Sequence, residues 1–254
     1  MGRVLLHEGN HSVTARLPRP LYAVVPAAGV GARMGAALPK QYLSLGGRTI
    51  AEHTVTRLLA FAPIRQVVVA VAEGDGWWPD LAVKAHHRVT TVTGGASRAE
   101  SVRAGLDAVL EQAPSAWVLV HDMARPLVRL SDIRALLGAV DAENRSSGAI
   151  LARRVSDTVK RSDSGQRIVE TLDREHIWRA LTPQLFSARE LREALAGGDG
   201  PLTDEASAME AVGHHPSLVE GRADNIKITV PEDLALARFY LQRQEEEGTA
   251  WRFA

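Results

Sequence analysis

The stretch Tyr22 to Tyr42, YAVVPAAGVGARMGAALPKQY, joins an apolar segment to a loop of small residues. The loop carries two charged side chains, Arg33 and Lys40, and both are positive. Glycines in the loop have no Cβ atom to keep an anion away from backbone N–H groups; they are Gly29, Gly31 and Gly35. The glycines alone would also fit a tight connection without a ligand. The paired cations favour a loop that binds a triphosphate.

Two other phosphate-binding motifs do not fit this loop. The Walker A pattern needs Gly-Lys-Ser/Thr, whereas Lys40 follows Pro39 and precedes Gln41. The dinucleotide fingerprint G-x-G-x-x-G fits Gly29 and Gly31 but meets Met34 where a small residue is needed. A Walker-type or NAD-binding loop is therefore disfavoured.

Length and composition predict one domain, and we expect it at residues 21–242, between a flexible tail at 1–20 and a C-terminal tail at 243–254. The chain has 254 residues, 45% of them hydrophobic, which suits one sizeable core. Its formal net charge is zero, so no global field favours nucleic acid or an anionic membrane. There is no cysteine, and no apolar run reaches the length of a membrane span. We expect a cytoplasmic protein that binds neither nucleic acid nor membrane.

Strand and helix patterns alternate along the first half of the chain. Apolar runs predict strands at 66–72, 89–92 and 116–122, and continuous runs of this kind suit a parallel sheet covered on both faces. Capping boxes at Thr49 with Glu52 and at Ser97 with Glu100 predict helix starts, and Ser131 predicts a third. The alternation predicts a doubly wound α/β fold with a mostly parallel sheet.

In such sheets, ligands bind beyond the carboxyl ends of the strands. The Gly29 loop, the Gly94-Gly95 pair and the sequence from His121 to Pro126 all follow predicted strands. Asp122, at the end of an apolar strand, needs a cation or a metal as its partner. We interpret His121 as a structural histidine. The sequence predicts one site at this edge of the sheet.

The second half of the chain departs from this alternation. The turn SDSGQ between two β-like segments predicts a β-hairpin arm at residues 152–174. An isolated hairpin needs a surface to pack on, and a second subunit is the best candidate. Further elements are predicted as helices at 187–196, from Thr203 and from Pro231, and as a strand at 215–219.

Adjacent histidines and tryptophans give no further site. His86-His87 and His214-His215 supply no third metal ligand, so we interpret them as surface residues. Trp77-Trp78 fits packing over a sheet edge better than stacking on a base.

Six stretches in one order resemble the 2-C-methyl-D-erythritol 4-phosphate cytidylyltransferase family, over about residues 21–242. They are PAAGVGARMGAALPKQY, GGASRAESV, VLVHDMARP, TLDREHIWRALTPQ, TDEASAME and VEGRADNIKIT. The resemblance implies a Rossmann-like fold and a homodimer joined by the β-arm. It also implies transfer of CMP from CTP to a sugar-alcohol phosphate with Mg²⁺, a step of the non-mevalonate isoprenoid pathway.

The resemblance also implies roles for individual residues. Arg33, Lys40, Arg174 and Lys227 would be catalytic. The nucleotide would be bound by Ala27, Ala28, Gly29, Arg33, Lys40, Gly95, Ser101 and Asp122. The acceptor would be bound by Arg125, Thr158, Arg174, Asp224 and Lys227, with Asp122 and Asp224 as metal ligands. Met123 and Ala96 depart from the residues usual in the family. Met123 would tighten the pocket, and Ala96 removes one contact with the base, so cytosine selectivity would depend more on backbone groups and Ser101.

Two other functions remain open from the sequence. A cytidylyltransferase for another polyol phosphate, such as ribitol 5-phosphate, would share the nucleotide half. The stretches TLDREHIWRALTPQ and VEGRADNIKIT favour the methylerythritol substrate. A regulator that binds a nucleotide without catalysis is the second alternative, and the presence of Lys40, Asp122 and Lys227 together argues against it.

Overall fold

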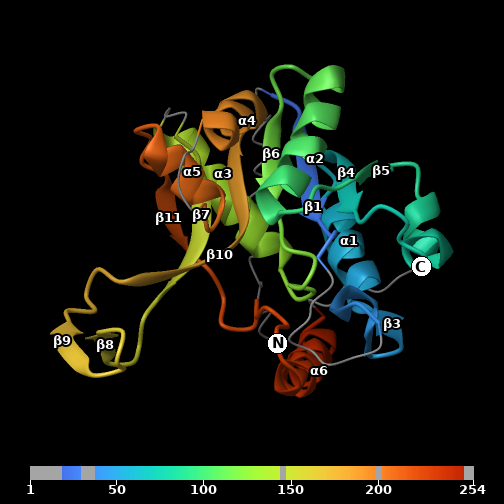
Figure 1. The fold of residues 1–254 in the computed structure, drawn as a ribbon. Coiled ribbons are helices and arrows are strands. Elements are labelled where there is room, and N and C mark those ends of the chain that lie inside the picture. The colour runs from blue at the N-terminus through green and yellow to red at the C-terminus, as the bar shows by residue number, and fades with distance from the viewer. Residues whose placement is uncertain (1–18, 30–37, 144–146, 198–201, 249–254) are drawn as a thin grey trace, which may run out of the picture.

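A computed structural model describes residues 19–29, 38–143, 147–197 and 202–248. Its centre is a seven-stranded sheet in the order β11-β7-β10-β6-β1-β4-β5 (Figure 1). The strands of this sheet are β1 (Leu21–Pro26), β4 (Ile64–Val71), β5 (Val89–Thr93), β6 (Trp117–Val120), β7 (Ala149–Arg154), β10 (Trp178–Ser187) and β11 (Ser217–Glu220). The predicted α/β fold with a mostly parallel sheet is confirmed.

The sheet is mixed because of β10. Strand β1 pairs in parallel with β4 and β6, β4 with β5, and β7 with β11. Strand β10 pairs antiparallel with both β6 and β7. Strands β7 and β10 were not predicted from the sequence. Pro183 interrupts the apolar pattern of β10, and the ladder to β7 is irregular between Ala180 and Gln184.

Helices cover both faces of the sheet. Alternate residues of β1 point to opposite faces, so Ala23 belongs to one core cluster and Val24 to the other. On the first face lie α1 (Ile50–Ala60) and α3 (Leu130–Glu143), and on the second lie α2 (Arg98–Gln112), α4 (Ala188–Gly197) and α5 (Glu205–Ala211). This arrangement leaves the carboxyl edge of the parallel strands for loops.

Two of the predicted helix caps are confirmed, and two predicted helix starts differ from the observed ones by one or two residues. Thr49 and Ser97 cap α1 and α2, each in a reciprocal pair with the glutamate three residues on. Ser131 is not a cap, because α3 already begins at Leu130. Helix α5 is capped by Asp204, whose side chain accepts from the N–H of Ser207, and not by Thr203.

A smaller cluster lies beside the main sheet. The last helix, α6 (Pro231–Glu246), packs Ala237 and Leu241 against Leu45 of the short pair β2 (Ser44–Leu45) and β3 (Arg48–Thr49). The same cluster includes Ile228, which follows the predicted acceptor residue Lys227. Helix α6 therefore supports the segment that carries Lys227. It extends beyond residue 242, where a tail was predicted to start.

The predicted arm is present, and its paired strands occupy less of the chain than the predicted range 152–174. Strands β8 (Val159–Ser162) and β9 (Ile168–Leu172) pair only with each other, and they project away from the remaining elements (Figure 1). Residues 152–154 belong to β7 of the main sheet instead. Ile168 and Val169 of β9 are exposed by 67% and 63%. An apolar pair this exposed lacks a packing surface within the described chain.

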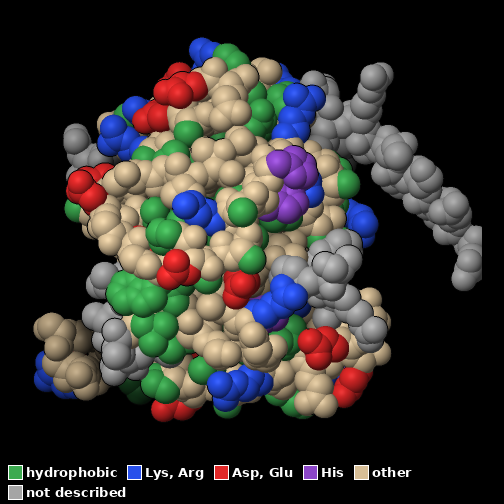
Figure 2. All heavy atoms as spheres, turned by 90° about the vertical axis from the view of Figure 1, so that its right-hand side faces the viewer, with side chains coloured by type: hydrophobic (Ala, Val, Ile, Leu, Met, Phe, Trp, Pro, Cys, Tyr) green, Lys and Arg blue, Asp and Glu red, His purple; other side chains and the backbone are tan. Residues whose placement is uncertain are grey.

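The surface shows charges of both signs. On the face drawn in Figure 2, basic and acidic side chains are interspersed without a large region of one sign. Trp78 is buried and donates from its ring N–H to Thr91 of the edge strand β5, as predicted, while Trp77 is half exposed and stacks on Tyr42. Among the helices of the described ranges, none combines the length and apolar character needed to cross a membrane.

Candidate active site

A cavity of about 190 Å³ lies at the carboxyl edge of the parallel strands, where the sequence predicted a site. Residues at the ends of β1, β5 and β6 form it together with Lys40 and Gln41, which precede β4, and with Lys227, which precedes α6. Its lining consists of Pro26, Ala27, Ala28, Gly29, Lys40, Gln41, Gly95, Ala96, Ser97, Arg98, Ser101, Asp122, Met123, Ala124 and Lys227. Five segments that are distant in sequence therefore meet in one cavity.

The wall after β1 is held by a buried glutamine. The side-chain amide of Gln41 donates to the carbonyls of Ala27 and Gly29, over 3.0 and 3.2 Å. Pro39 precedes a short 3-10 helix at Lys40–Tyr42, which places Lys40 beside the cavity. The ammonium group of Lys40 donates to the carbonyl of Ile228 over 3.1 Å. Arg33, the other predicted cation of this loop, lies outside the described residues.

The wall after β5 needs glycine for steric reasons. A Cβ atom on Gly94 would lie 2.7 Å from Oγ of Ser101 and 2.8 Å from Cβ of Ala28. Ser101 is buried and accepts the N–H of Gly95 over 3.2 Å. The short distance from Gly94 to Ala28 shows that the wall after β5 lies close against the wall after β1. Small residues on both sides leave backbone groups accessible to a planar ligand.

Asp122 is the centre of the charged part of the cavity. One carboxylate oxygen, Oδ1, lies 3.0 Å from Arg98, and the other, Oδ2, lies 2.8 Å from Lys227 and 3.7 Å from Arg125. Burial alone would raise the pKa of Asp122, but the positive charges of Arg98, Lys227 and Arg125 outweigh it and hold that pKa well below its usual range. Asp122 is therefore an anion at any working pH.

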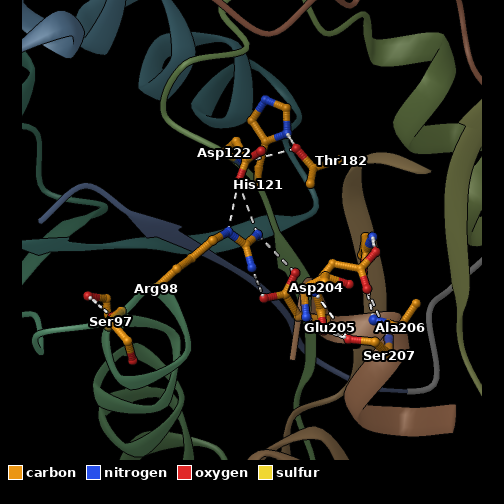
Figure 3. Close-up of polar contacts among 12 residues, drawn as sticks. Ser97, Arg98, His121, Asp122, Thr182, Asp204, Glu205, Ala206 and Ser207 are labelled. Carbon is orange, nitrogen blue, oxygen red and sulfur yellow. Dashed lines mark hydrogen bonds and ion pairs between the residues drawn. The ribbon is translucent and has the colours of Figure 1, made fainter. Parts of the chain in front are cut away.

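His121 supports Asp122 through Thr182, which contacts both residues (Figure 3). The N–H of Asp122 donates to Oγ1 of Thr182, and Nδ1 of His121 lies 3.0 Å from the same oxygen. Nε2 of His121 lies 3.0 Å from the carbonyl of Arg125, which can only accept. Nε2 therefore carries the proton, and Nδ1 accepts from the Thr182 hydroxyl. This fixes a neutral ring in a structural role, as predicted.

Comparisons with known proteins agree with this geometry. A sequence profile of 2-C-methyl-D-erythritol 4-phosphate cytidylyltransferase matches residues 21–243. The chain belongs to this family. The enzyme of that name from Aeromonas hydrophila is 56% identical over 91% of this chain and 93% of its own, and the one from Vibrio cholerae is 52% identical over 89% and 98%. The crystal structure of the Francisella tularensis cytidylyltransferase superposes with a TM-score of 0.72 at 33% identity, covering 87% of this chain and 99% of that one.

Most of the residues expected from the cytidylyltransferase resemblance lie at the cavity. Ala27, Ala28, Gly29, Lys40, Gly95, Ser101, Asp122 and Lys227 line it. Arg125 is buried behind Asp122 and donates to the carbonyl of Asn225 over 2.8 Å. Met123 and Ala96, which depart from the family pattern, also line the cavity.

Three expected residues lie elsewhere in the described chain. Asp224 is not part of the cavity lining, and its carboxylate is bound by Arg129 and by the side-chain amide of Gln244. Thr158 precedes strand β8 of the arm, and Arg174 follows β9 and donates to the carbonyl of Ser156. Neither arm residue reaches the cavity of its own chain.

Sequence reasoning missed four residues that shape the cytidylyltransferase cavity. They are Arg98, Glu205, Thr182 and Gln41. Gln41 could have been found from its place beside Lys40. The other three act through partners far along the chain: Arg98 and Glu205 are 107 residues apart, and Thr182 is 61 residues from His121. A single sequence carries no local signal for such contacts.

Of the two carboxylates expected to bind a metal, Asp122 is the one that faces the cavity. Among the described residues there is no group of three or more His, Asp or Glu side chains that could hold a metal by themselves. Mg²⁺, however, is often held by one carboxylate together with substrate phosphates. Asp122 lines the cavity and suits that arrangement, whereas Asp224 does not line it.

Proposed function

We propose that this cavity is where the chain carries out the reaction of its family. CMP passes from CTP to 2-C-methyl-D-erythritol 4-phosphate, pyrophosphate leaves, and the product belongs to the non-mevalonate route to isoprenoid precursors. The observation that carries the proposal is the meeting of Lys40, Asp122 and Lys227 with two walls of small residues in one cavity.

The cavity divides into a part for the base and a part for the phosphates. Ala27, Ala28 and Gly29 on one wall, with Gly95 and Ser101 on the other, would hold the cytidine through backbone groups. Lys40 lies at the end of the first wall and would bind the triphosphate, together with Arg33. Asp122 and Lys227 lie on the side left for the acceptor.

The reaction depends on positioning and charge neutralisation and not on a catalytic general base. An oxygen of the acceptor's phosphate attacks the α-phosphorus of CTP and forms the new P–O bond. The bond from the α-phosphorus to the oxygen that bridges to the β-phosphorus breaks, and pyrophosphate keeps the electron pair. Two anions must approach each other, so Lys40 and Lys227 would neutralise charge on the two reacting groups. One well-placed cation of this kind is worth about 3 kcal/mol in the barrier.

A divalent cation is part of the proposal. When bound, it would neutralise phosphate charge and orient the triphosphate. Asp122 would contribute the protein's carboxylate, and Asp224 would not, because its partners Arg129 and Gln244 hold it away from the cavity. Titration of the chain with Mn²⁺ by electron paramagnetic resonance, with and without CTP, tests this. Asp122→Asn should weaken metal binding and Asp224→Asn should not.

The arm supports a homodimer in which each chain completes its partner's site. Its two strands pair only with each other, and Ile168 and Val169 remain exposed within the described chain. Packing against a second copy would bury them and carry Thr158 and Arg174 to the other cavity. Light scattering should then give the mass of two chains. Replacing Ile168 and Val169 with serine should shift that mass toward one chain.

A mixing experiment tests the shared site. Lys40→Ala and Arg174→Ala should each lower turnover strongly. In a mixed dimer, one cavity combines the intact Lys40 with the intact Arg174, so mixing the two inactive variants should restore about a quarter of wild-type turnover per chain. Random exchange makes half of the dimers mixed, and each mixed dimer has one functional cavity out of two, which gives a quarter of the cavities. No recovery after demonstrated subunit exchange would contradict the shared site.

Pyrophosphate release tests the reaction itself. CTP with 2-C-methyl-D-erythritol 4-phosphate should turn over much faster than UTP or ATP with the same acceptor. Ribitol 5-phosphate is the competing acceptor, and faster turnover with it would overturn the substrate assignment. The proposal includes a cytoplasmic location, since the reaction consumes CTP, and cell fractionation checks that location.

A further inference from the structure

Arg98 joins two carboxylates that come from different parts of the fold (Figure 3). It is the first residue of α2, and its guanidinium group holds Glu205 of α5 in a two-pronged contact, 2.6 Å from Nη1 and 3.0 Å from Nη2. Its Nε donates to Oδ1 of Asp122 over 3.1 Å. Burial alone would lower the pKa of Arg98, but both carboxylates outweigh it and raise that pKa. Arg98 therefore remains charged between them.

Glu205 is a fixed anchor for Arg98. Its side chain is only 1% exposed, and it lies in the first turn of α5. The side chain of Gln184 of β10 holds the start of that helix: its Oε1 accepts the N–H of Ala206 over 2.9 Å, and its Nε2 donates to the carboxylate of Asp204 over 2.8 Å. The anchor is thereby attached to the central sheet. Arg98 cannot follow a movement of Asp122 without giving up this contact.

The two oxygens of the Asp122 carboxylate face different cations. Oδ1 faces Arg98, whereas Oδ2 faces Lys227 at 2.8 Å and the more distant Arg125 at 3.7 Å. Lys227 is 40% exposed and lines the cavity, so its position depends on the oxygen available to it. If Oδ1 had no partner, the carboxylate could rotate and offer Lys227 either oxygen. Arg98 removes that freedom.

We propose that Arg98, anchored by Glu205, is a positioning residue for nucleotidyl transfer: it occupies Oδ1 of Asp122 and so holds Lys227 where the acceptor's phosphate must lie. This inference rests on the proposed function, because it takes Asp122 and Lys227 as parts of the site. The charge of Arg98 is already balanced by Glu205. Its contribution is therefore geometric, and Lys40 and Lys227 remain the cations available to the substrates.

The matching alternative is an ion pair that only ties α2 to α5. The chain offers a control for it, because Arg192 of α4 contacts Asp107 of the same helix α2 over 2.6 Å, and neither residue lines the cavity. Arg98→Met with Glu205→Gln removes the anchored pair without leaving an unpaired buried charge, which would be strongly destabilising. Arg192→Met with Asp107→Asn is the corresponding control pair.

Steady-state pyrophosphate release with both substrates, combined with thermal melting, distinguishes a positioning role of Arg98 from an ion pair that only joins α2 to α5. Arg98→Met/Glu205→Gln should lower kcat/KM for the acceptor about a hundredfold, since misplacement of a reacting group by ~1 Å costs that much. The KM for CTP should change far less, because the walls that hold the base keep their own hydrogen bonds to Gln41 and Ser101. The control pair should keep its kinetic constants.

The conservative variant Arg98→Lys tests geometry against charge. Lysine keeps the positive charge but lacks the planar fork that spans Glu205 and Asp122 together. It should lower kcat/KM for the acceptor about tenfold, a partial rescue relative to the double variant. Wild-type kinetics in a folded Arg98→Met/Glu205→Gln protein would overturn the inference, as would an equal loss in the control pair. An inactive wild-type chain would instead overturn the proposed function.

Discussion

The stability of this chain should fall between pH 7.5 and pH 5 because of His121. The ring is fully buried and neutral, with Nδ1 accepting from Thr182 and Nε2 donating to the carbonyl of Arg125. Burial lowers the pKa of His121 to about 4, against about 6.5 for a histidine in an unfolded chain. Between these two values the unfolded chain binds more protons than the folded chain. Stability is therefore complete above about pH 6.5 and is lost as the pH falls toward 4.

The size of the effect follows from the two pKa values. Lowering the pH from 7.5 to 5 should cost about 2 kcal/mol of unfolding free energy through His121 alone. Below about pH 4 the ring is protonated in both states, and its contribution no longer changes. Burial also lowers the pKa of His53, so the wild-type chain will show a larger total effect.

A histidine variant isolates the contribution. Urea unfolding should be measured at fixed protein concentration in a chelating buffer, from pH 7.5 to 5, for wild type, His121→Asn and His215→Asn. Asparagine cannot titrate, so His121→Asn should be less stable at pH 7.5 but should lose about 2 kcal/mol less on acidification. His215 is exposed and serves as the control. If His121→Asn kept the wild-type dependence on pH, the neutral buried ring would be refuted.

Three further predictions concern the cavity and the sheet. Lys40→Ala should lower kcat about a hundredfold while changing the KM for CTP much less, measured by pyrophosphate release. Gly94→Ala would place its Cβ 2.7 Å from Oγ of Ser101 and push the two walls apart. It should raise the KM for CTP about tenfold, which corresponds to a loss of ~1.4 kcal/mol in binding. Gly76→Ala, whose Cβ would meet nothing within 4 Å, is the control. Gly148→Ala should cost about 3 kcal/mol of unfolding free energy in urea, because φ is +83° there and the Cβ would lie 2.2 Å from Phe186.

The parts of the fold that were predicted correctly have local signals. Thr49 with Glu52 and Ser97 with Glu100 lie within one helical turn, and the structure confirms both capping boxes. The apolar run at residues 66–72 is β4, which extends from Ile64 to Val71. Residues that follow a strand directly, such as Asp122, were placed at the cavity for the same reason. Each of these features depends on neighbours in sequence.

The parts that were missed depend on distant partners. Strand β10 contains Pro183 and changes its pairing within its own length, so neither alternation nor composition identifies it. From the sequence alone, Arg98 is indistinguishable from a solvated arginine at the start of a helix. Its partner Glu205 lies 107 residues away and is identified only in the structure. Asp224 was expected near the metal because of its motif. Its partners Arg129 and Gln244 lie 95 and 20 residues away along the chain, so the sequence does not specify these contacts locally.

Strand β10 links the separate parts of the proposed site. At one end, Trp178 pairs with Arg154 of β7, where the chain enters and leaves the arm. In the middle, Thr182 binds both His121 and the N–H of Asp122. Two residues on, Gln184 holds the helix start that presents Glu205 to Arg98. The arm, the acid at the end of β6 and the anchor of Arg98 are therefore set by one strand. Because β10 runs antiparallel to β7, the chain leaves β7 for the arm and returns into β10 at the same carboxyl edge of the sheet, which a parallel strand in that position would reach only through a crossover.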